Sequence, residues 1–562
     1  MKILLAACNA KYIHSNPAVY DLRAFASEYK EHILLGEYTI NQTRDEILKD
    51  IYRSGAEVVC FSCYIWNISF IRDLIPDLKK ILPGTAFWVG GPEVSFDAEN
   101  FLREMPQVTG VMVGEGEETF LELTRYYIEG KGTLADIRGI AFRENGQIFH
   151  NGWRDVMDLS RVPFAYEQTE DFANRIIYYE SSRGCPFSCS YCLSSIDKKL
   201  RFRDLELVKK ELQFFLDKKV PQVKFVDRTF NCKHDHAMEI WKYILDHDNG
   251  VTNFHFEISA DLLREEELEL MSRMRPGLIQ LEIGVQSTNP DTICAIHRNM
   301  DLKKLETSVA RVKSFGNIHQ HLDLIAGLPY EDYESFRRSF EQVYRMKPDQ
   351  LQLGFLKVLK GSSMYHEAQK YEIVYKEKEP YEVLSTAWLS YKDILKLKMV
   401  ESMVEVYYNS GQFRKTLSWI ETFYQDMFSF YESLGAYYEE KGYEEVSHSR
   451  LRRYEILLEF LKEKTQLSVN TVAQYMVYDL YLREKLKKRP VFASDQKPYE
   501  ASVRNYRKAN KISKTAHIEV FEDGSAVLFD YEKRDPLTNN ALSELIFPKQ
   551  NSESNDKQKC DL

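Results

Sequence analysis

Short apolar runs separated by amphipathic stretches dominate the first part of the chain. The runs cover residues 2–8, 32–38, 57–64, 85–91 and 110–116. They are continuously apolar, which is typical of strands buried on both faces, whereas a strand with one face in water alternates. Strand and helix in alternation predict an α/β fold with a doubly wound, Rossmann-like parallel sheet over residues 1–135.

A hairpin and a linker are expected between residues 136 and 173. Two alternating segments flank Asn145-Gly146, and this dipeptide favours the two-residue turns of β-hairpins. The stretch that follows, residues 158–168, has the composition of a linker. The sequence therefore separates a first domain from the next alternating region.

Strand and helix patterns alternate again from residue 174 to 360. The six candidate strands cover residues 176–182, 222–227, 254–259, 278–287, 321–327 and 350–358. A helix pattern follows each of the first five. These βα-type repeats predict a partial (β/α)6 barrel of the TIM type, although a full barrel fits the pattern as well. Functional loops leave the C-terminal ends of barrel strands, so the chemistry is expected there.

Long helical patterns rich in tyrosine and charge replace the alternation after residue 361. Residues 361–548 are therefore expected to form a mainly helical domain with a late hairpin around Asp523-Gly524. Aromatic residues at helical spacing are usually core, and roles in closing the barrel mouth, binding substrate or contacting a partner remain open. The polar tail at 549–562 is expected to be disordered.

The composition is that of a folded, acidic protein. Among 562 residues, 75 Lys and Arg stand against 85 Asp and Glu, which gives a formal charge of −10. This balance argues against a broad basic surface for nucleic acid. No apolar run reaches the roughly 18 residues that a membrane span needs, and the first residues lack a signal-peptide pattern. A cytoplasmic enzyme is the default expectation.

The nine cysteines narrow the chemistry. An odd number in a chain of this length does not indicate a disulfide scaffold, so reduced thiols or metal ligands are expected. Cys185, Cys189 and Cys192 form a C-x3-C-x2-C pattern directly after a predicted strand. Closely spaced thiolates suit iron–sulfur or zinc chemistry, but structural zinc needs a fourth ligand that this segment does not supply. Three ligands leave one metal position open for a substrate.

With Tyr191 before the third cysteine, this loop resembles the C-x3-C-x-aromatic-C motif of the radical S-adenosylmethionine (SAM) enzymes. The resemblance implies a 4Fe-4S cluster held by the three cysteines, with SAM chelated by the free iron and Tyr191 beside the adenine. One-electron reduction would split SAM to a 5′-deoxyadenosyl radical. A reducing partner such as flavodoxin or ferredoxin is implied as the electron source.

The resemblance continues along the predicted barrel, whose strand motifs look like those of oxygen-independent coproporphyrinogen oxidase and its relatives. By that resemblance Asp227 faces the amino nitrogen of SAM. Glu257, Gln286, Arg298 and Asp323 fall where those enzymes hold the ribose and carboxylate. A guanidinium fork suits a carboxylate on physical grounds, since it makes two parallel hydrogen bonds. For each residue taken alone, a salt bridge at the barrel rim is the competing interpretation.

Glycine-rich loops follow the fourth and fifth strands of the first domain. Gly90, Gly91, Gly114 and Gly116 would let backbone amides approach a flat or phosphate-bearing ligand. A dinucleotide is less expected, because G-x-G-x-x-G is absent after the first strand. Placed before a radical SAM barrel, VGGPEVS and VGEGEETF resemble the cobalamin-binding domain of the cobalamin-dependent radical SAM class, which implies cobalamin as a second cofactor.

The D-x-H-x-x-G signature of cobalamin proteins with a histidine cobalt ligand is missing. His14 lies in the appropriate loop without the aspartate, so a loop or surface histidine is the favoured interpretation and an axial ligand the alternative. Many members of the class bind cobalamin with no protein ligand below the cobalt. Ser62 and Trp66 are candidates to line the macrocycle, with core packing equally open.

Cys60 and Cys63 form a C-x2-C pair on a predicted strand. Residues three apart on a strand point to opposite faces, so buried thiols are the favoured interpretation. Together with Cys8 they raise the alternative of a methylthiotransferase, a radical SAM class with a second cluster on three cysteines. Their close spacing and the lack of an evident small basic β-domain at the C-terminus argue against it.

The sequence as a whole predicts a cobalamin-dependent radical SAM enzyme that methylates or otherwise modifies an unactivated carbon of an unknown substrate. Relatives of this class also carry out ring closure and rearrangement, so these reactions remain alternatives. A non-catalytic cobalamin or iron–sulfur binding module is the alternative of another kind, and the open cluster position argues against it.

Overall fold

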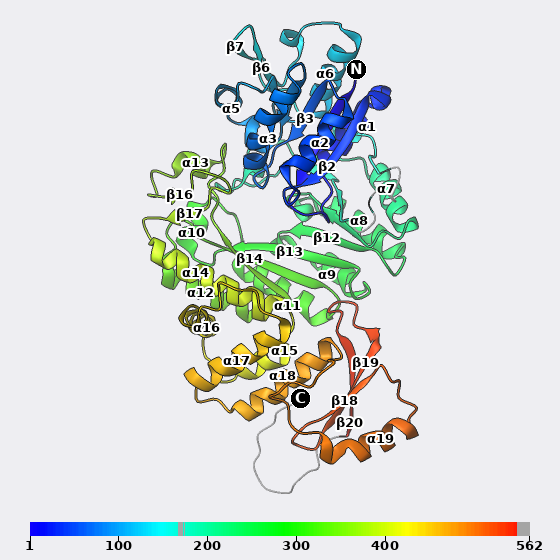
Figure 1. Cartoon of the computed structure of the whole chain (residues 1–562), viewed down its shortest axis with the longest axis vertical. Coiled ribbons are helices and arrows are strands. Elements are labelled where there is room, and N and C mark those ends of the chain that lie inside the picture. Colours follow the sequence, from blue (N-terminus) through cyan, green and yellow to red (C-terminus); the bar gives the residue numbers. More distant parts are fainter. Residues whose placement is uncertain (167–171, 173–174, 548–562) are drawn as a thin grey trace. The chain divides into compact units, whose positions relative to one another are not determined.

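The computed structural model describes residues 1–166, 172 and 175–547 (Figure 1). The chain divides into two compact units. The first consists of Met1–Ser339 with Leu353–Ile394, and the second of Phe340–Gln352 with Leu395–Leu562. The tail expected to be disordered, 549–562, lies outside the described residues.

A seven-stranded sheet forms the N-terminal part of the first unit, in the order β2-β1-β3-β4-β5-β6-β7. Its five parallel strands lie where the apolar runs predicted them: β1 (Ile3–Asn9), β2 (Ile33–Thr39), β3 (Val58–Ser62), β4 (Ala86–Gly90) and β5 (Gly110–Met112). The predicted hairpin, β6 (Ile140–Glu144) and β7 (Gln147–His150), turns at Asn145-Gly146 and joins β5 antiparallel. The sheet therefore extends past residue 135.

Helices cover both faces of this sheet. Its helices are α1 (Pro17–Phe25), α2 (Arg44–Ser54), α3 (Ile68–Ile81), α4 (Pro92–Ser95), α5 (Ala98–Glu104) and α6 (Glu117–Glu129). Side chains of α2, α3 and α5 form a core with one face, whereas α1 and α6 pack on the other. Burial on both faces explains why the strands read as unbroken apolar runs. It also brings the loops after β1, β3, β4 and β5 to one edge.

A second sheet follows in the same unit, in the order β15-β14-β13-β12-β11-β8. Its strands are β8 (Ile177–Tyr179), β11 (Gln222–Phe225), β12 (Asn253–Ile258), β13 (Ile279–Gln286), β14 (His319–Ala326) and β15 (Gln350–Phe355). All six were predicted. The order ends on β8 and β15, so the described strands form an open sheet, the partial barrel.

Helices alternate with these strands as predicted. They are α7 (Leu205–Asp217), α8 (His234–Asp246), α9 (Glu265–Ser272), α10 (Pro290–Ala295), α11 (Leu302–Phe315) and α12 (Tyr333–Arg345). A two-residue ladder, β9 (Ser182–Arg183) with β10 (Arg201–Phe202), closes the loop that carries the three clustered cysteines. The unit ends with α13 (Ser363–Glu367) and the unpredicted pair β16 (Val374–Tyr375) and β17 (Val383–Ser385).

The second unit is mainly helical, as expected. After α14 (Tyr391–Met403) it contains a π-helical turn (Val404–Asn409), α15 (Arg414–Ile420), α16 (Met427–Lys441), α17 (Arg450–Lys464), α18 (Val469–Arg483) and α19 (Glu500–Ala509). The late hairpin, β18 (His517–Val520) and β19 (Ala526–Arg534), is confirmed, and β20 (Ala541–Phe547) adds an unpredicted third strand.

Tyrosines of the second unit belong to its core. Tyr407, Tyr431 and Tyr454 are completely buried, which is the interpretation that helical spacing favoured. Their hydroxyls remain paired, for example Tyr407 with Tyr438 at 2.8 Å. None of the helices in the described part of the chain combines the length and apolar character required to cross a bilayer.

Candidate functional site

A cavity of about 1000 Å³ in the first unit is lined by residues of both sheets and of their loops. On one side it is lined by the loops after β1, β3, β4 and β5, and on the other by β8, β11, β12 and the cysteine loop. The lining includes all six positions predicted for cobalamin and one predicted for SAM: His14, Ser62, Gly90, Gly91, Gly114, Gly116 and Glu257.

Close packing accounts for two of the loop glycines. Gly91 has φ +112°, and a Cβ there would lie 2.5 Å from the carbonyl oxygen of Cys63. Gly114 has φ +79°, and its Cβ would lie 3.0 Å from the Trp153 ring. Larger residues would be strained at both positions. These glycines therefore shape the edge of the sheet, and they do not by themselves identify the ligand.

His14 is held by a partner from the other sheet. Its Nδ1 lies 2.6 Å from the hydroxyl of Tyr178, at the start of the barrel. Burial, followed by the nearby charges of Lys11 and Lys224, lowers the pKa of His14, which favours a neutral ring. A neutral imidazole fixed at one nitrogen is suited to offer the other to a metal. A role as axial ligand remains the alternative to a loop histidine.

Asn16 is a candidate that the sequence reasoning missed. Its side-chain Nδ2 donates to Ser62 Oγ at 3.0 Å, while its Oδ1 is buried with no partner among the described residues. Both residues line the cavity. A buried acceptor without a donor is costly unless a ligand supplies one. Amide side chains of a corrin ring would supply such donors, so the site fits cobalamin.

Aromatic rings add flat apolar surface to this side. Trp66 stacks on Tyr64 with ring centroids 4.5 Å apart, and Trp153 lies 5.5 Å from Phe96. All four rings line the cavity. The two tryptophans remain 43% and 44% exposed, so their faces are available to a large planar ligand.

The cysteine loop is anchored at several points. Cys185 N donates to the carbonyl of Asp197 at 3.1 Å, and Ser190 N donates to the carbonyl of Ile296 at 2.9 Å. The thiols of Cys185 and Cys189 are largely buried, whereas Cys192 is partly exposed. Each of the eight cysteines within the described ranges is a free thiol. The loop thus presents three thiols without a competing disulfide, as a three-cysteine cluster requires.

Arg298 lies beside this loop. Its Nη1 is 3.4 Å from the Tyr191 hydroxyl and 3.9 Å from Cys189 Sγ, and its Nη2 donates to the carbonyl of Gly284. The Nε is buried without a partner among the described residues. An orphaned guanidinium donor next to the cluster thiols fits an anionic group such as the SAM carboxylate. Gln286 lies nearby in sequence at a bulge, with φ +71°.

Asp227, unlike the other predicted SAM contacts, is hydrogen-bonded to the two serines that precede the cysteine loop. Its carboxylate accepts from Ser181 Oγ at 2.7 Å, Ser181 N at 2.9 Å and Ser182 Oγ at 2.6 Å. It is 1% exposed, and burial raises its pKa to about 6. These bonds fix the chain just before the cysteine loop. A direct contact with SAM stays a prediction.

Glu257 and Asp323 belong to a layer of ion pairs inside the barrel. Glu257 lies 4.0 Å from Lys224 and 3.9 Å from Arg228, and burial raises its pKa to about 7. Asp323 pairs with His321 at 3.0 Å. The competing interpretation, a salt-bridged residue, therefore describes both in this structure.

Glu282, His321 and Asp323 place one ligand atom each within 4.8 Å of one another, as a metal site would. However, Lys224 Nζ lies 3.0 Å from Glu282 and already supplies the positive charge that a cation would bring. Like charges in such proximity repel. We therefore treat the trio as part of the ion-pair layer.

The C-x2-C pair behaves as two separate buried thiols. Cys60 packs in the core on one face of the first sheet, whereas Cys63 and Cys8 pack in the core on the other. Burial raises the pKa of Cys60 and Cys8 to about 12 and also raises that of Cys63. Thiols on opposite faces cannot share one three-cysteine cluster, which weighs against the methylthiotransferase alternative.

Three regions of the chain match known protein families. Residues 4–124 match the family described as B12 binding domain, and residues 179–343 match the radical SAM superfamily. The chain contains a B12-binding domain followed by a radical SAM domain. Residues 369–532 match a family described as protein of unknown function, DUF4080. The cofactors expected from the sequence, a 4Fe-4S cluster, SAM and cobalamin, are those of the first two families.

Curated relatives match about half of the chain. An uncharacterised methyltransferase of Pyrococcus horikoshii is 25% identical over 300 residues, 52% of this chain and 64% of that protein. An anaerobic magnesium-protoporphyrin IX monomethyl ester cyclase of Rubrivivax gelatinosus is 22% identical over 58% of this chain and 60% of that protein. The chain thus spans less than two thirds of the length of either relative.

The fold also resembles a solved structure. The cobalamin-dependent SAM radical enzyme OxsB, solved with aqua-cobalamin and SAM bound, has a TM-score of 0.60 and 14% identity, covering 91% of this chain and 81% of that one. The similarity confirms the predicted α/β architecture of the two cofactor domains.

Proposed function

We propose that this protein is a cobalamin-dependent radical SAM enzyme that methylates an unactivated carbon of its substrate. One observation carries the proposal: loops of the B12-binding domain and the cysteine loop of the radical SAM domain line the same cavity. Groups bound by the two domains would share one volume, in which a substrate carbon can meet both.

The chain's own residues have distinct tasks in this proposal. Cys185, Cys189 and Cys192 hold the cluster, while Arg298 and Tyr191 orient SAM. When bound, the cluster and SAM would supply, after one-electron reduction, the chemistry that removes a hydrogen atom from the substrate, and cobalamin would supply a methyl group. Asn16 and Ser62 hold the polar edge of the corrin. Trp66 and Trp153 cover apolar surface and keep water from the cavity.

Gln286 and Asp323 extend the proposed SAM site along β13 and β14. Both residues occupy partly exposed strand positions, which we assign to the barrel interior. Along β12 to β14 these positions alternate with buried ones that are mostly apolar. Glu257 lines the cavity itself. Hydroxyl groups of a ribose can replace part of the ion-pair layer because carboxylates accept such bonds readily.

Ring closure is the second candidate reaction. The similarity to the magnesium-protoporphyrin ester cyclase extends over 58% of this chain, and that to the Pyrococcus methyltransferase over 52%. Both classes would use the same cavity, and residues 369–532 would then select the substrate. We further propose flavodoxin or ferredoxin as reductant and an oxygen-free cytoplasm as the setting, because open clusters and free thiols need reducing conditions.

Anaerobic reconstitution tests the proposal. The purified protein is loaded with iron, sulfide and hydroxocobalamin, reduced in the presence of SAM, and assayed for 5′-deoxyadenosine and for the bound cobalamin spectrum. We expect both signals. Deoxyadenosine without bound cobalamin would reject the cobalamin assignment alone, and its complete absence, with a cell extract added as substrate source, would reject the radical enzyme.

A further inference from the structure

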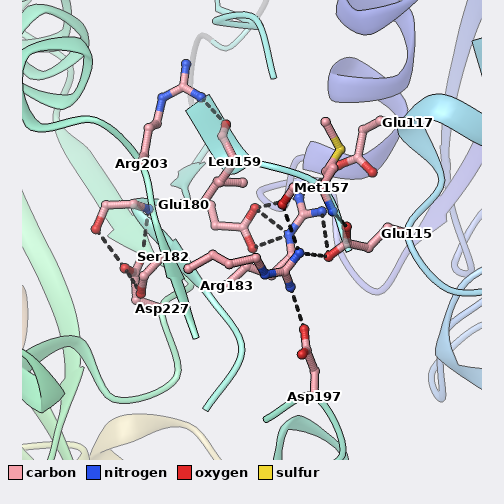
Figure 2. A network of polar contacts seen from close by, with 12 residues as sticks. Glu115, Glu117, Met157, Leu159, Glu180, Ser182, Arg183, Asp197, Arg203 and Asp227 are labelled. Atoms are coloured by element: carbon pink, nitrogen blue, oxygen red, sulfur yellow. Dashed lines mark hydrogen bonds and ion pairs between the residues drawn. The ribbon is translucent and has the colours of Figure 1, made fainter. Parts of the chain in front are cut away.

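Two arginines of the cysteine loop are bound to one loop of the B12-binding domain. Arg183 lies two residues before Cys185, and Arg201 faces it across the short β9–β10 ladder. Their partners are Glu115 and Glu117 (Figure 2). Glu115 lies between β5 and α6, in the segment that also contains Gly114 and Gly116, and Glu117 is the first residue of α6.

The contacts form two parallel chains of ion pairs. In the first, Arg183 Nη2 lies 2.8 Å from Glu117 and 2.7 Å from Glu180. In the second, Arg201 Nη1 lies 2.5 Å from Glu115, and its Nη2 lies 2.5 Å from Asp197. A longer contact of 3.5 Å from Arg183 to Glu115 joins the two chains. Bidentate and branched pairs of this kind fix geometry as well as charge.

Burial makes these pairs different from surface salt bridges. The side chain of Glu117 is 6% exposed, and those of Glu115 and Arg201 are 19% and 14% exposed. Removing one partner of a buried ion pair strongly destabilises the folded protein, whereas exposed ion pairs contribute little to its stability. The network therefore holds the two loops in one arrangement.

Each end of the network reaches a proposed cofactor site. Asp197 accepts from Arg201 through its side chain, and its carbonyl accepts from Cys185 N. At the other end, Glu115 and Glu117 line the cavity together with Gly114 and Gly116. The path from the corrin-facing loop to the first cluster cysteine thus passes through three side chains, those of Glu115, Arg201 and Asp197, and one backbone hydrogen bond.

We propose that Glu115, Glu117, Arg183 and Arg201 are positioning residues that fix the spacing between the cobalamin loop and the cluster loop. The inference rests on the proposed function, since it assigns the two loops to the two cofactors. None of the four needs to touch a reacting atom. Their effect is on how closely the two reaction centres approach, because transfer between them requires a defined geometry.

The test measures proximity and does not require the substrate. Cobalamin in its cob(II) form and the reduced cluster are both paramagnetic, so reducing the cluster speeds the electron-spin relaxation of nearby cob(II)alamin. We expect the wild type to show this enhancement and Glu115→Gln/Glu117→Gln to lose most of it, while both retain iron and cobalamin. Glu122→Gln is the matched control, because Glu122 lies on α6 but pairs with Arg154 instead.

Each outcome is decisive. Enhancement in the double variant equal to that of the wild type would overturn the positioning role, and equal loss in Glu122→Gln would attribute the effect to general destabilisation. If the double variant does not fold, Glu115→Asp carries the test, since it keeps the charge and withdraws the carboxylate by one methylene. A wild type that binds no cobalamin would instead reject the proposed function.

Discussion

The two sheets of the first unit share the alternation of strands and helices but differ in how the side chains of their strands are buried. In the B12-binding sheet the central strands are buried on both faces, and β1 has no partly exposed residue. In the radical SAM sheet, β12, β13 and β14 alternate strictly between buried and partly exposed positions. The first sheet thus offers a ligand its loops, whereas the second also offers polar side chains from the strands themselves.

This difference indicates at which positions a substitution should have a large effect in each sheet. In the first sheet they are places where backbone packs against backbone, such as Gly91. In the second they are charged side chains, such as Glu282 and Arg298, and the cysteine loop attached to the edge of the sheet. Changes of each kind should therefore have separable effects, and four substitutions test this.

Cys189→Ala should have the largest effect. Loss of one of three thiolate ligands should prevent cluster assembly, so iron should fall from about four per chain to background. Cys63→Ala is the control, because its thiol lies in the core of the first sheet. Iron content after anaerobic reconstitution measures both. Equal iron loss in the two variants would contradict the division of the thiols.

Gly91→Ala should destabilise the fold at the edge of the first sheet. Its Cβ would meet the Cys63 carbonyl at 2.5 Å in a backbone conformation that alanine disfavours, at a cost of about 2–4 kcal/mol. Urea unfolding and cobalamin retention measure the effect. Gly84→Ala is the matched control, because nothing lies within 4 Å of its added methyl group. Identical stability of the two variants would show that the close approach is dispensable.

Glu282→Gln should change how the free energy of unfolding depends on pH in the acid range. Burial alone would raise the pKa of Glu282, but bonds from His255 and Lys224 hold it at about 2. Because the folded-state pKa is depressed, this stabilisation is present above the ordinary value of about 4.5 and is lost as pH falls toward 2.

The expected contribution is about 1–3 kcal/mol at neutral pH. Urea unfolding of both proteins at pH 6 and pH 3 measures it. The difference between wild type and Glu282→Gln should shrink at the lower pH. A difference in unfolding free energy that is independent of pH would mean that His255 and Lys224 do not stabilise the ionised carboxylate of Glu282.

Arg298→Lys should have the smallest effect. An ammonium keeps the charge but loses the planar fork that reaches Gly284 and an anionic ligand together. We expect about tenfold weaker SAM binding, equivalent to about 1.4 kcal/mol, with unchanged iron content. Equilibrium dialysis on the reconstituted protein measures it. Arg311→Lys is the control, since Arg311 forms an exposed pair with Glu265; equal weakening in both would remove Arg298 from the site.

Much of this organisation was predictable because it is local in sequence. The cysteine spacing and the Asn145-Gly146 turn each occupy a few consecutive residues, and the strands follow from periodicity. The late third strand β20 was missed because its sequence, ALSELIF, does not alternate between apolar and polar residues, and most of its positions are exposed. Asn16 was missed because a single amide carries no pattern, and only burial reveals that its Oδ1 lacks a donor.

The sequence by itself predicted most of the helices and strands and, by resemblance, the cofactor classes and the three candidate cluster cysteines. Tertiary structure alone decided which distant groups meet: Arg298 with Cys189 across 109 positions, and Arg201 with Glu115 across 86. It also separated Cys60 from Cys63 onto opposite faces. The physical reason is that local patterns fix backbone conformation, whereas buried ion pairs and thiol environments depend on which surfaces exclude water together.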